Sequence, residues 1–205
     1  MDIDLLVNAL DLIATFTFAF VGARIAASKG LDYGGIVLIA AVASLSGGTL
    51  RNLFLSQRPH WILHPWIFVA VILAVLITIL GRQIGPVSRL VISLDSLGLA
   101  VAGVSSAQFA ITHQAGAIGS IVLGVIGAIS GGLFRDLMCQ VEPVVLHRET
   151  IATATLSGCS LYVALNALMI DPWLSAICGA LVIIAVREIS IKYDLNLPRI
   201  NKKNS

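Results

Sequence analysis

The stretch Ser46-Gly47-Gly48-Thr49-Leu50-Arg51-Asn52-Leu53 returns 84 residues later as Ser130-Gly131-Gly132-Leu133-Phe134-Arg135-Asp136-Leu137. The same offset pairs Asp11 with Asp95, and the alignment needs no gap. In so apolar a chain, a gapless match at glycine and charged positions is not expected by chance. The sequence therefore contains an internal duplication.

Composition indicates that both copies lie in a membrane. The 205 residues are 58% hydrophobic and 12% charged, and the mean hydropathy is +0.96. Soluble domains are about one quarter charged, and a run of about 20 apolar residues is long enough to cross a bilayer as a helix. The sequence predicts spans at about Leu5–Ala27, Tyr33–Leu55, Leu63–Leu80, Leu90–Ile111, Ala117–Met138, Thr150–Ile170 and Trp173–Ile191.

These spans predict an all-α membrane protein of seven transmembrane helices. Spans one to three correspond to spans four to six, and an odd number of spans per copy makes the copies insert in opposite directions. The expected divisions are 1–88 for the first three-helix repeat, 89–171 for the second, inverted repeat, 172–192 for the seventh helix, and 193–205 for a basic cytoplasmic tail.

The distribution of Lys and Arg predicts the orientation. Seven spans place the termini on opposite faces, and the face with the N-terminus carries only Arg51 and Arg58. The other face carries Arg24, Lys29, Arg82, Arg89, Arg135, Arg148, Arg187, Lys192, Arg199, Lys202 and Lys203. Because basic residues stay in the cytoplasm, we expect a bacterial inner-membrane protein with its N-terminus outside and its C-terminus in the cytoplasm.

The glycine pairs are the first candidate site. Each glycine lowers helix propensity by about 1 kcal/mol, and a bend or break there would free backbone groups that a bilayer tolerates only beside protein or a water-filled cavity. Symmetry-related weak points of this kind indicate a permeation site at the repeat interface. The alternative is that Gly47, Gly48, Gly131 and Gly132 only permit close helix packing.

The arginine in each motif is the second candidate. An arginine at the centre of a bilayer costs about 2.5 to 3.5 kcal/mol on insertion scales, which favours a functional role. The alternative is that Arg51 and Arg135 snorkel to the nearer interface. Other polar residues that would suit a narrow wet path are Thr15, Thr17, Ser44, Ser46, Ser105, Ser106, Gln108 and Ser130.

Buried charges need partners, and each copy supplies an aspartate at a matching depth. We therefore expect Asp11 to pair with Arg51 and Asp95 to pair with Arg135. The alternative local partners are Asn52 and Asp136.

Several function classes lack their sequence features. We find no nucleophile–base constellation, phosphate-cradling loop or metal-ligand spacing, so we expect no enzyme activity, no cofactor and no metal site. The four histidines are expected at loop edges, and the cysteines Cys139, Cys159 and Cys178 as buried thiols. No nucleic-acid patch is evident, and the basic tail would suit anionic lipid.

The doubled motif, with Pro59 and Pro143 behind it, resembles the twin signature of the prokaryotic relatives of the trimeric intracellular cation (TRIC) channels. That family shares its domain with bacterial proteins described as glycine transporters. The resemblance covers nearly the whole chain. It implies a homotrimer with one pore in each protomer, framed by the second and fifth helices, which kink at the glycine pairs. The implied permeant ion is a monovalent cation, chiefly potassium.

The resemblance also implies which residues form the pore or its gate. One position departs from the repeat, because the first copy has Asn52 where the second has Asp136, so one acidic group is missing. The animal members' lysine-rich lipid-binding motif is absent, so phosphoinositide control is not expected. With the motif serines and Asn52, the pore or gate candidates are Ser46, Gly47, Gly48, Arg51, Asn52, Ser130, Gly131, Gly132, Arg135 and Asp136.

Three functions remain open. A potassium channel fits if the arginines, which repel cations, are neutralised or act as gates. A secondary transporter for a small zwitterion such as glycine fits if broken helices present their N-termini to a carboxylate. A membrane scaffold would leave the doubled motif unexplained. The resemblance favours the channel.

Overall fold

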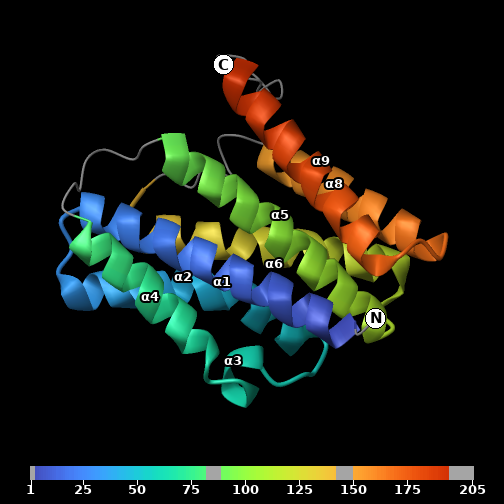
Figure 1. Ribbon diagram of the computed structural model, residues 1–205, viewed down its shortest axis with the longest axis horizontal. Helices are drawn as coiled ribbons and strands as arrows, with labels where there is room; N and C mark the ends of the chain where they lie inside the picture. Colours follow the sequence, from blue (N-terminus) through green and yellow to red (C-terminus); the bar gives the residue numbers. More distant parts are fainter. Residues whose placement is uncertain (1–2, 82–88, 142–149, 194–205) are drawn as a thin grey trace, which may run out of the picture.

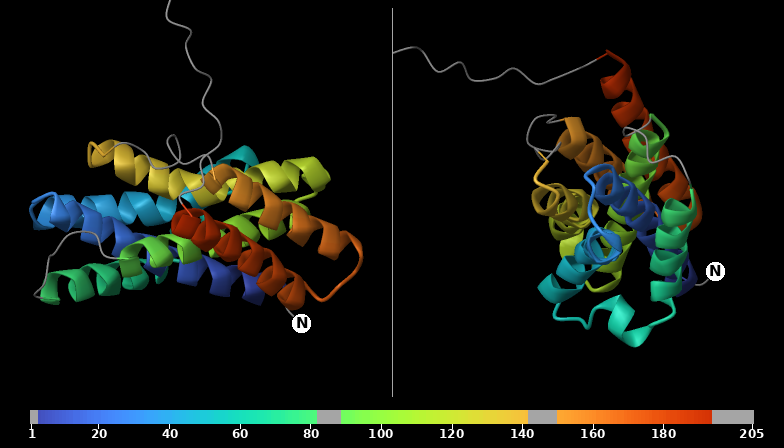
Figure 2. Two further views of the ribbon diagram at one scale, coloured as in Figure 1. Left: turned by 90° about the horizontal axis from the view of Figure 1, so that it is seen from above. Right: turned by 90° about the vertical axis from the view of Figure 1, so that its left-hand side faces the viewer.

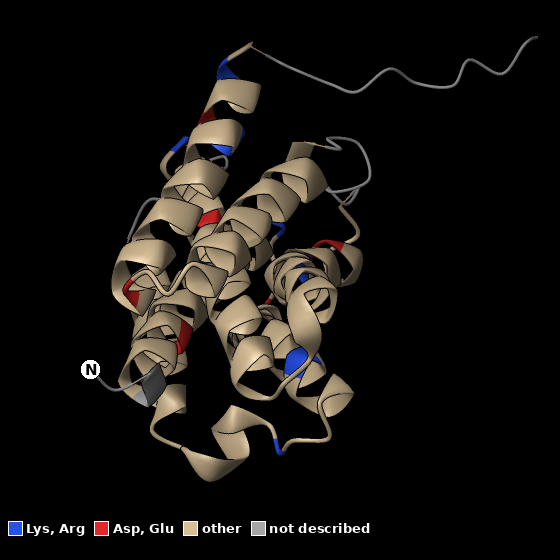
Figure 3. Ribbon diagram, turned by 90° about the vertical axis from the view of Figure 1, so that its right-hand side faces the viewer, with Lys and Arg blue, Asp and Glu red and all other residues tan. Residues whose placement is uncertain are grey.

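The computed structural model describes residues 3–81, 89–141 and 150–193, and within these ranges the chain is helical with no β-strand (Figure 1). The helices are α1 (Ile3–Ser28), α2 (Tyr33–Phe54), α3 (His60–Leu63), α4 (Ile67–Leu80), α5 (Arg89–Thr112), α6 (Gly116–Met138), α8 (Thr150–Ala167) and α9 (Pro172–Tyr193). The all-α fold class is confirmed. Figure 3 shows how few charged residues the helices carry.

One predicted boundary is wrong. The third span was expected from Leu63, but the chain forms the one-turn α3, leaves helical geometry at His64, and begins α4 at Ile67. The reason is Pro65, because the ring of a proline disfavours the helical conformation in the residue before it.

Five helices of the described chain are long and apolar enough to cross a membrane, namely α1, α2, α5, α6 and α9. Helix α4 has only 14 residues, and the predicted count of seven spans stays a prediction. The expectations for Arg82, Pro143, Arg148 and the tail beyond Tyr193 fall outside the described residues.

The duplication extends to the ends of the helices. In each copy the first two helices end at a residue of positive φ, and the next backbone N–H bonds to the carbonyl five residues back, which closes the helix. The first helices end at Gly30 and Gln114, with bonds Leu31 to Ala26 and Ala115 to Ala110. The second helices end at Ser56 and Gln140, with bonds Gln57 to Asn52 and Val141 to Asp136.

The two copies pack against each other in antiparallel fashion. Helix α1 lies along α5, where Asp11 contacts Ser105 and Phe18 faces Gly98 about two turns further on. Helix α2 lies antiparallel to α6, because Gly47 faces Gly127 and Gly131 faces Ala43. Figures 1 and 2 show these four helices at the centre, with α4 packed on α1 and α8 packed on α6. The last helix, α9, packs on α5 and α8, and the short α3 packs on α2.

Candidate functional site

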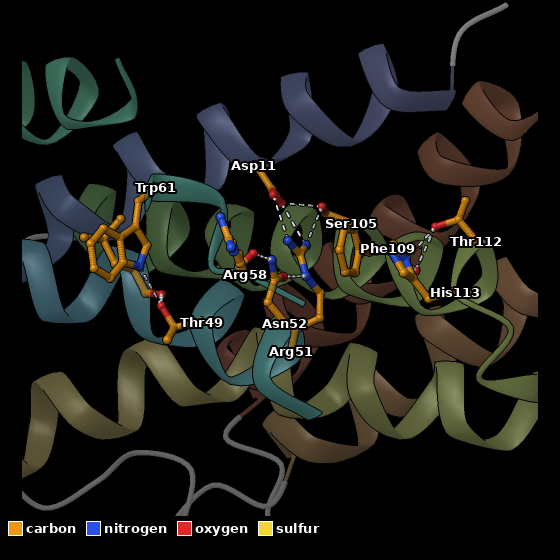
Figure 4. A network of polar contacts seen from close by, with 11 residues as sticks. Asp11, Thr49, Arg51, Asn52, Arg58, Trp61, Ser105, Phe109, Thr112 and His113 are labelled. Atoms are coloured by element: carbon orange, nitrogen blue, oxygen red, sulfur yellow. Dashed lines mark hydrogen bonds and ion pairs between the residues drawn. The ribbon is translucent and has the colours of Figure 1, made fainter. Parts of the chain in front are cut away.

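Arg51 of α2 and Asp11 of α1 form a buried ion pair with two parallel contacts (Figure 4). The Arg51 Nη2 atom lies 3.0 Å from Asp11 Oδ2 and its Nη1 atom 3.1 Å from Asp11 Oδ1. The arginine side chain is 1% exposed and the aspartate side chain 12%. This two-point geometry is the strong form of an arginine–carboxylate contact, and it stabilises a charge that would be costly in hydrocarbon.

Further residues occupy the other sides of the Arg51 guanidinium. Its Nε donates to Asn52 Oδ1 at 2.9 Å, and its Nη1 also donates to Ser105 Oγ at 3.3 Å. Ser105 in turn donates to Asp11. The ring of Phe109 covers the guanidinium face, 4.2 Å from the Arg51 Cζ atom, a distance at which a cation–π attraction operates. Arg51 therefore faces protein and does not snorkel to an interface.

The second copy builds the equivalent unit at the other end of the α2–α6 pair. Arg135 Nη1 lies 2.6 Å from Asp95 Oδ1, and Arg135 Nε lies 2.9 Å from Asp136 Oδ1. The aspartate at 136 occupies the place that Asn52 holds in the first unit. By formal charge, Arg51, Asp11 and Asn52 sum to zero, whereas Arg135, Asp95 and Asp136 sum to minus one.

The repeat offset predicts what surrounds each arginine, and here the copies differ. The positions equivalent to Ser105 and Phe109 are Val21 and Ile25. At these two positions the first unit therefore has a hydroxyl and an aromatic ring, where the second copy has aliphatic side chains. The sequence analysis did not identify Phe109 as a site residue. The available signal was that the second copy has an aromatic residue at this position, where the first copy has the aliphatic Ile25.

The two glycines of each pair do different things. A Cβ atom on Gly47 would overlap the Gly127 carbonyl oxygen, and one on Gly131 would overlap the Ala43 carbonyl oxygen. These glycines let α2 and α6 cross in contact. A Cβ atom on Gly48 would meet nothing nearer than Arg51 Nη2 at 4.0 Å, and one on Gly132 would lie 3.5 Å from Arg135 Nη2.

The glycine pairs do not break their helices, whereas the kink expected at these pairs stays a prediction. Both α2 and α6 continue through their glycine pairs without interruption. The close crossing explains this, because two backbones in contact exclude the water or side chains that a broken helix would need as partners.

We call Gly48, Arg51 and Asp11 the first Gly–Arg–Asp unit, and their equivalents in the second copy, Gly132, Arg135 and Asp95, the second. Each unit borders a small cavity, of about 40 Å³ for the first and about 20 Å³ for the second. Seven lining positions are equivalent under the repeat offset, including both aspartates, both arginines and the second glycine of each pair. Thr15 and Thr49 of the first cavity correspond to Leu99 and Leu133 of the second. The first cavity is therefore the more polar one. One water molecule needs a cavity volume of about 10 to 15 Å³. A hydrated ion carries several water molecules, so neither cavity is large enough for one.

A larger cavity of about 420 Å³ adjoins the second unit. Its charged lining residues are Lys29, Asp95, Arg135, Asp136 and Arg187, and its walls are aliphatic residues such as Val21, Ile25 and Val91. The second unit thus faces a roomy vestibule, whereas α3 with His60 and Trp61 borders the cavity of the first.

The other polar candidates divide between the cavity and the helix interfaces. Thr15, Ser44 and Ser106 line the first cavity. Thr17 donates to the Ile13 carbonyl, Ser130 donates to the Ile126 carbonyl, and Gln108 accepts from Tyr162. The Ser46 hydroxyl is buried and has no hydrogen-bond partner within the described residues. Sequence reasoning also missed the hydrogen bond from Trp61 Nε1 to Thr49 Oγ1, at 3.0 Å, which ties α3 to α2.

The profile of the glycine transporter family matches residues 8–83 and matches again, at the repeat offset, over residues 92–167. The chain belongs to this family. A curated relative, the UPF0126 inner membrane protein YadS of Escherichia coli (strain K12), is 29% identical over 95% of this chain and 96% of its own length. A UPF0126 membrane protein of Deinococcus radiodurans is 31% identical over 92% of this chain and 89% of its own.

Among solved structures, the chain is similar to the TRIC trimeric intracellular cation channel orthologue from Rhodobacter sphaeroides. The TM-score is 0.85 at 32% identity, with 92% of this chain and 98% of the other covered. The resemblance inferred from the doubled motif is therefore confirmed. The chain is a family member with several helices suited to a membrane, and its structural neighbours are channels rather than enzymes.

Proposed function

We propose that this protein is a monovalent-cation channel, with potassium as the main permeant ion. The path in each protomer runs along α2 and α6, from one Gly–Arg–Asp unit to the other. The observation that carries this proposal is the pair of equivalent units at opposite ends of the α2–α6 crossing. The similarity to the TRIC channel of Rhodobacter sphaeroides supports it.

The charge balance of the two units supports a cation path. An uncompensated arginine would repel cations, but Arg51 meets one carboxylate and Arg135 meets two. The path crosses the contact at Gly47 and Gly131, where the helices touch. Conduction therefore requires α2 and α6 to separate at this crossing, and the present structure corresponds to a closed pore.

Unbroken helices count against the alternative, a secondary transporter of glycine. A zwitterion site at mid-membrane would use free helix N-termini to bind the carboxylate, and neither α2 nor α6 presents one within its length. Because the family takes its name from glycine transport, the experiment below also tests for glycine uptake.

The proposal includes the assembly and the orientation. Self-association as a homotrimer is supported by the trimeric TRIC orthologue. Seven spans, divided at residues 1–88, 89–171 and 172–192, with the N-terminus outside and the C-terminus in the cytoplasm, follow from the duplication and the distribution of basic residues. Cross-linking of the protein in its membrane is expected to yield monomer, dimer and trimer bands. A reporter that works only in the cytoplasm is expected to be active when it is fused to the C-terminus.

The decisive experiment is recording from the purified protein in a planar bilayer under a potassium chloride gradient. We expect discrete current steps that reverse near the potassium potential. Asp136→Asn removes one carboxylate from the lining beside the second unit while keeping the shape of the side chain, so it is expected to shift the reversal potential toward that of chloride. Asp171→Asn is the matched control, because Asp171 is exposed and only caps α9.

Two results would contradict the channel. If no current appears and liposomes take up glycine in a saturable manner, the protein is a carrier. If currents appear but Asp136→Asn and Asp171→Asn behave alike, the second unit does not line the path.

A further inference from the structure

Two histidine rings lie close together in the short segment that joins α2 to α4. The backbone N–H of His64 bonds to the His60 carbonyl at 2.9 Å, four residues back, which is one α-helical turn. That turn places both imidazoles on the same side of α3, with ring centroids 4.5 Å apart and ring planes inclined by 38°. The sequence spacing is the i, i+4 spacing at which two histidines share a metal ion in known sites, here with His64 at the C-cap of α3.

The surroundings of the pair leave a ring nitrogen without a partner. The Nε2 atom of His60 is buried and makes no hydrogen bond within the part of the chain that the structure describes. Leaving a buried polar atom without a partner destabilises a fold, so the His60 Nε2 atom is available to bind a ligand. His64 is exposed, so the pair can be reached from solution.

Aromatic packing explains only part of this geometry. The Trp66 ring lies 6.5 Å from the His60 ring and 6.3 Å from the His64 ring. These contacts account for the ring positions, but they give no partner to the His60 nitrogen. Neutral imidazole nitrogens are preferred ligands of Zn²⁺, Cu²⁺ and Ni²⁺.

We infer that His60 and His64 form a binding site for a divalent transition-metal ion, Zn²⁺ in the first instance. Within the described residues no third histidine, cysteine, aspartate or glutamate joins a cluster with them, so water completes the coordination. The site is therefore open and exchangeable, unlike a closed four-ligand structural zinc site. Sequence analysis assigned these histidines no metal role, because loop-edge placement alone does not bring two rings together.

The position of the site suggests what the ion does. His60 lines the first cavity together with Asp11 and Arg51, and α3 is tied to α2 through the Trp61–Thr49 hydrogen bond. A divalent ion there adds positive charge at the mouth of the path and fixes α3 against it. If the proposed channel function holds, Zn²⁺ on this side slows cation passage. The binding itself does not depend on that function.

Binding is tested on the full-length protein in nanodiscs after removal of any purification tag. Cu²⁺ quenches tryptophan fluorescence at short range, and Trp61 and Trp66 flank the pair, so Cu²⁺ titration reports occupancy and Zn²⁺ competition reports its affinity. Because even the loss of a residue that supports a ligand weakens metal sites about 10- to 100-fold, we expect His64→Gln and His60→Gln to weaken Zn²⁺ by at least about tenfold. His113→Gln is the control, since His113 stacks on Phe109 in the turn between α5 and α6.

The outcomes separate this inference from the proposed function. Loss of Zn²⁺ competition in both pair variants, with His113→Gln unchanged, supports the site. The site is wrong if the unmodified protein is not quenched, if His64→Gln keeps its affinity, or if His113→Gln loses as much. Circular dichroism checks that each variant is folded. If quenching follows the expected pattern while no variant conducts, the metal site stands and the channel proposal fails.

Discussion

Gly47 and Gly131 hold reciprocal places in the crossing of α2 and α6. Gly47 lies against the Gly127 carbonyl oxygen and Gly131 against the Ala43 carbonyl oxygen, and the two contacts are related by the offset of the sequence repeat. Exchanging the two copies turns one of these contacts into the other. An approximate two-fold axis therefore lies between the two helices. The axis passes through the place where α2 and α6 touch.

The first prediction concerns the glycine pairs. Gly47→Ala forces a Cβ atom into a backbone oxygen, which cannot move aside as a side chain can. We expect a loss of about 1 to 3 kcal/mol of stability, as for other overpacked positions. Gly48→Ala is the matched control, because its Cβ atom meets only open space beside Arg51 and alanine favours the helix by about 1 kcal/mol. Thermal unfolding in detergent measures both, and equal melting temperatures would contradict the close crossing.

The second prediction concerns the Arg51–Asp11 pair. Breaking a buried pair by removing one partner costs about 3 to 5 kcal/mol because the other charge is left alone. We expect Arg51→Met and Asp11→Asn each to destabilise the protein, and the double variant to lose much less than the sum. Since distant sites add within about 0.5 kcal/mol, Arg51→Met with Asp95→Asn serves as the control cycle. Additivity in both cycles would mean that Asp11 does not compensate Arg51.

The third prediction concerns Phe109, whose ring covers the Arg51 guanidinium. Phe109→Leu keeps the apolar volume but removes the π face, so we expect a loss of up to about 2 kcal/mol, the range for desolvated cation–π contacts. Phe109→Tyr keeps the ring and should lose less. The loss should shrink when Phe109→Leu is made in the Arg51→Met background. A loss of the same size in both backgrounds would assign the effect to packing alone.

The fourth prediction concerns pH. Burial holds the pKa of His60, outside the spanning helices, below its usual value of 6.5. The unfolded chain therefore binds more protons at this residue than the folded chain as pH falls through the region below 6.5, so the folded state loses stability there. We expect the melting temperature to fall between about pH 7 and pH 5, and His60→Gln to reduce that fall. His64→Gln is the comparison, and an equal pH dependence in the unmodified protein and His60→Gln would exclude His60 as the source.

The sequence by itself determined the class of the protein and its symmetry. Apolar composition decided that the helices lie in a membrane, because hydrocarbon tolerates few charges. The gapless offset from Asp11 to Asp95 and from Arg51 to Arg135 showed the duplication, and an odd number of helices per copy predicted the antiparallel arrangement of α1 on α5. The same symmetry indicated that each arginine would find an aspartate, since a charge in hydrocarbon needs a partner.

Only the tertiary structure decided which partner sits on which face. The glycines of each pair are adjacent in sequence, yet Gly47 packs against α6 and Gly48 leaves space beside Arg51, because neighbouring residues on a helix point in different directions. Phe109 and Ser105 reach Arg51 from more than 50 residues away, and no local pattern encodes that contact. The unbroken course of α2 and α6 through their glycine pairs also depends on the packing of one helix against another. A helix keeps or loses its backbone hydrogen bonds according to what packs against it, and that is a property of the assembled bundle.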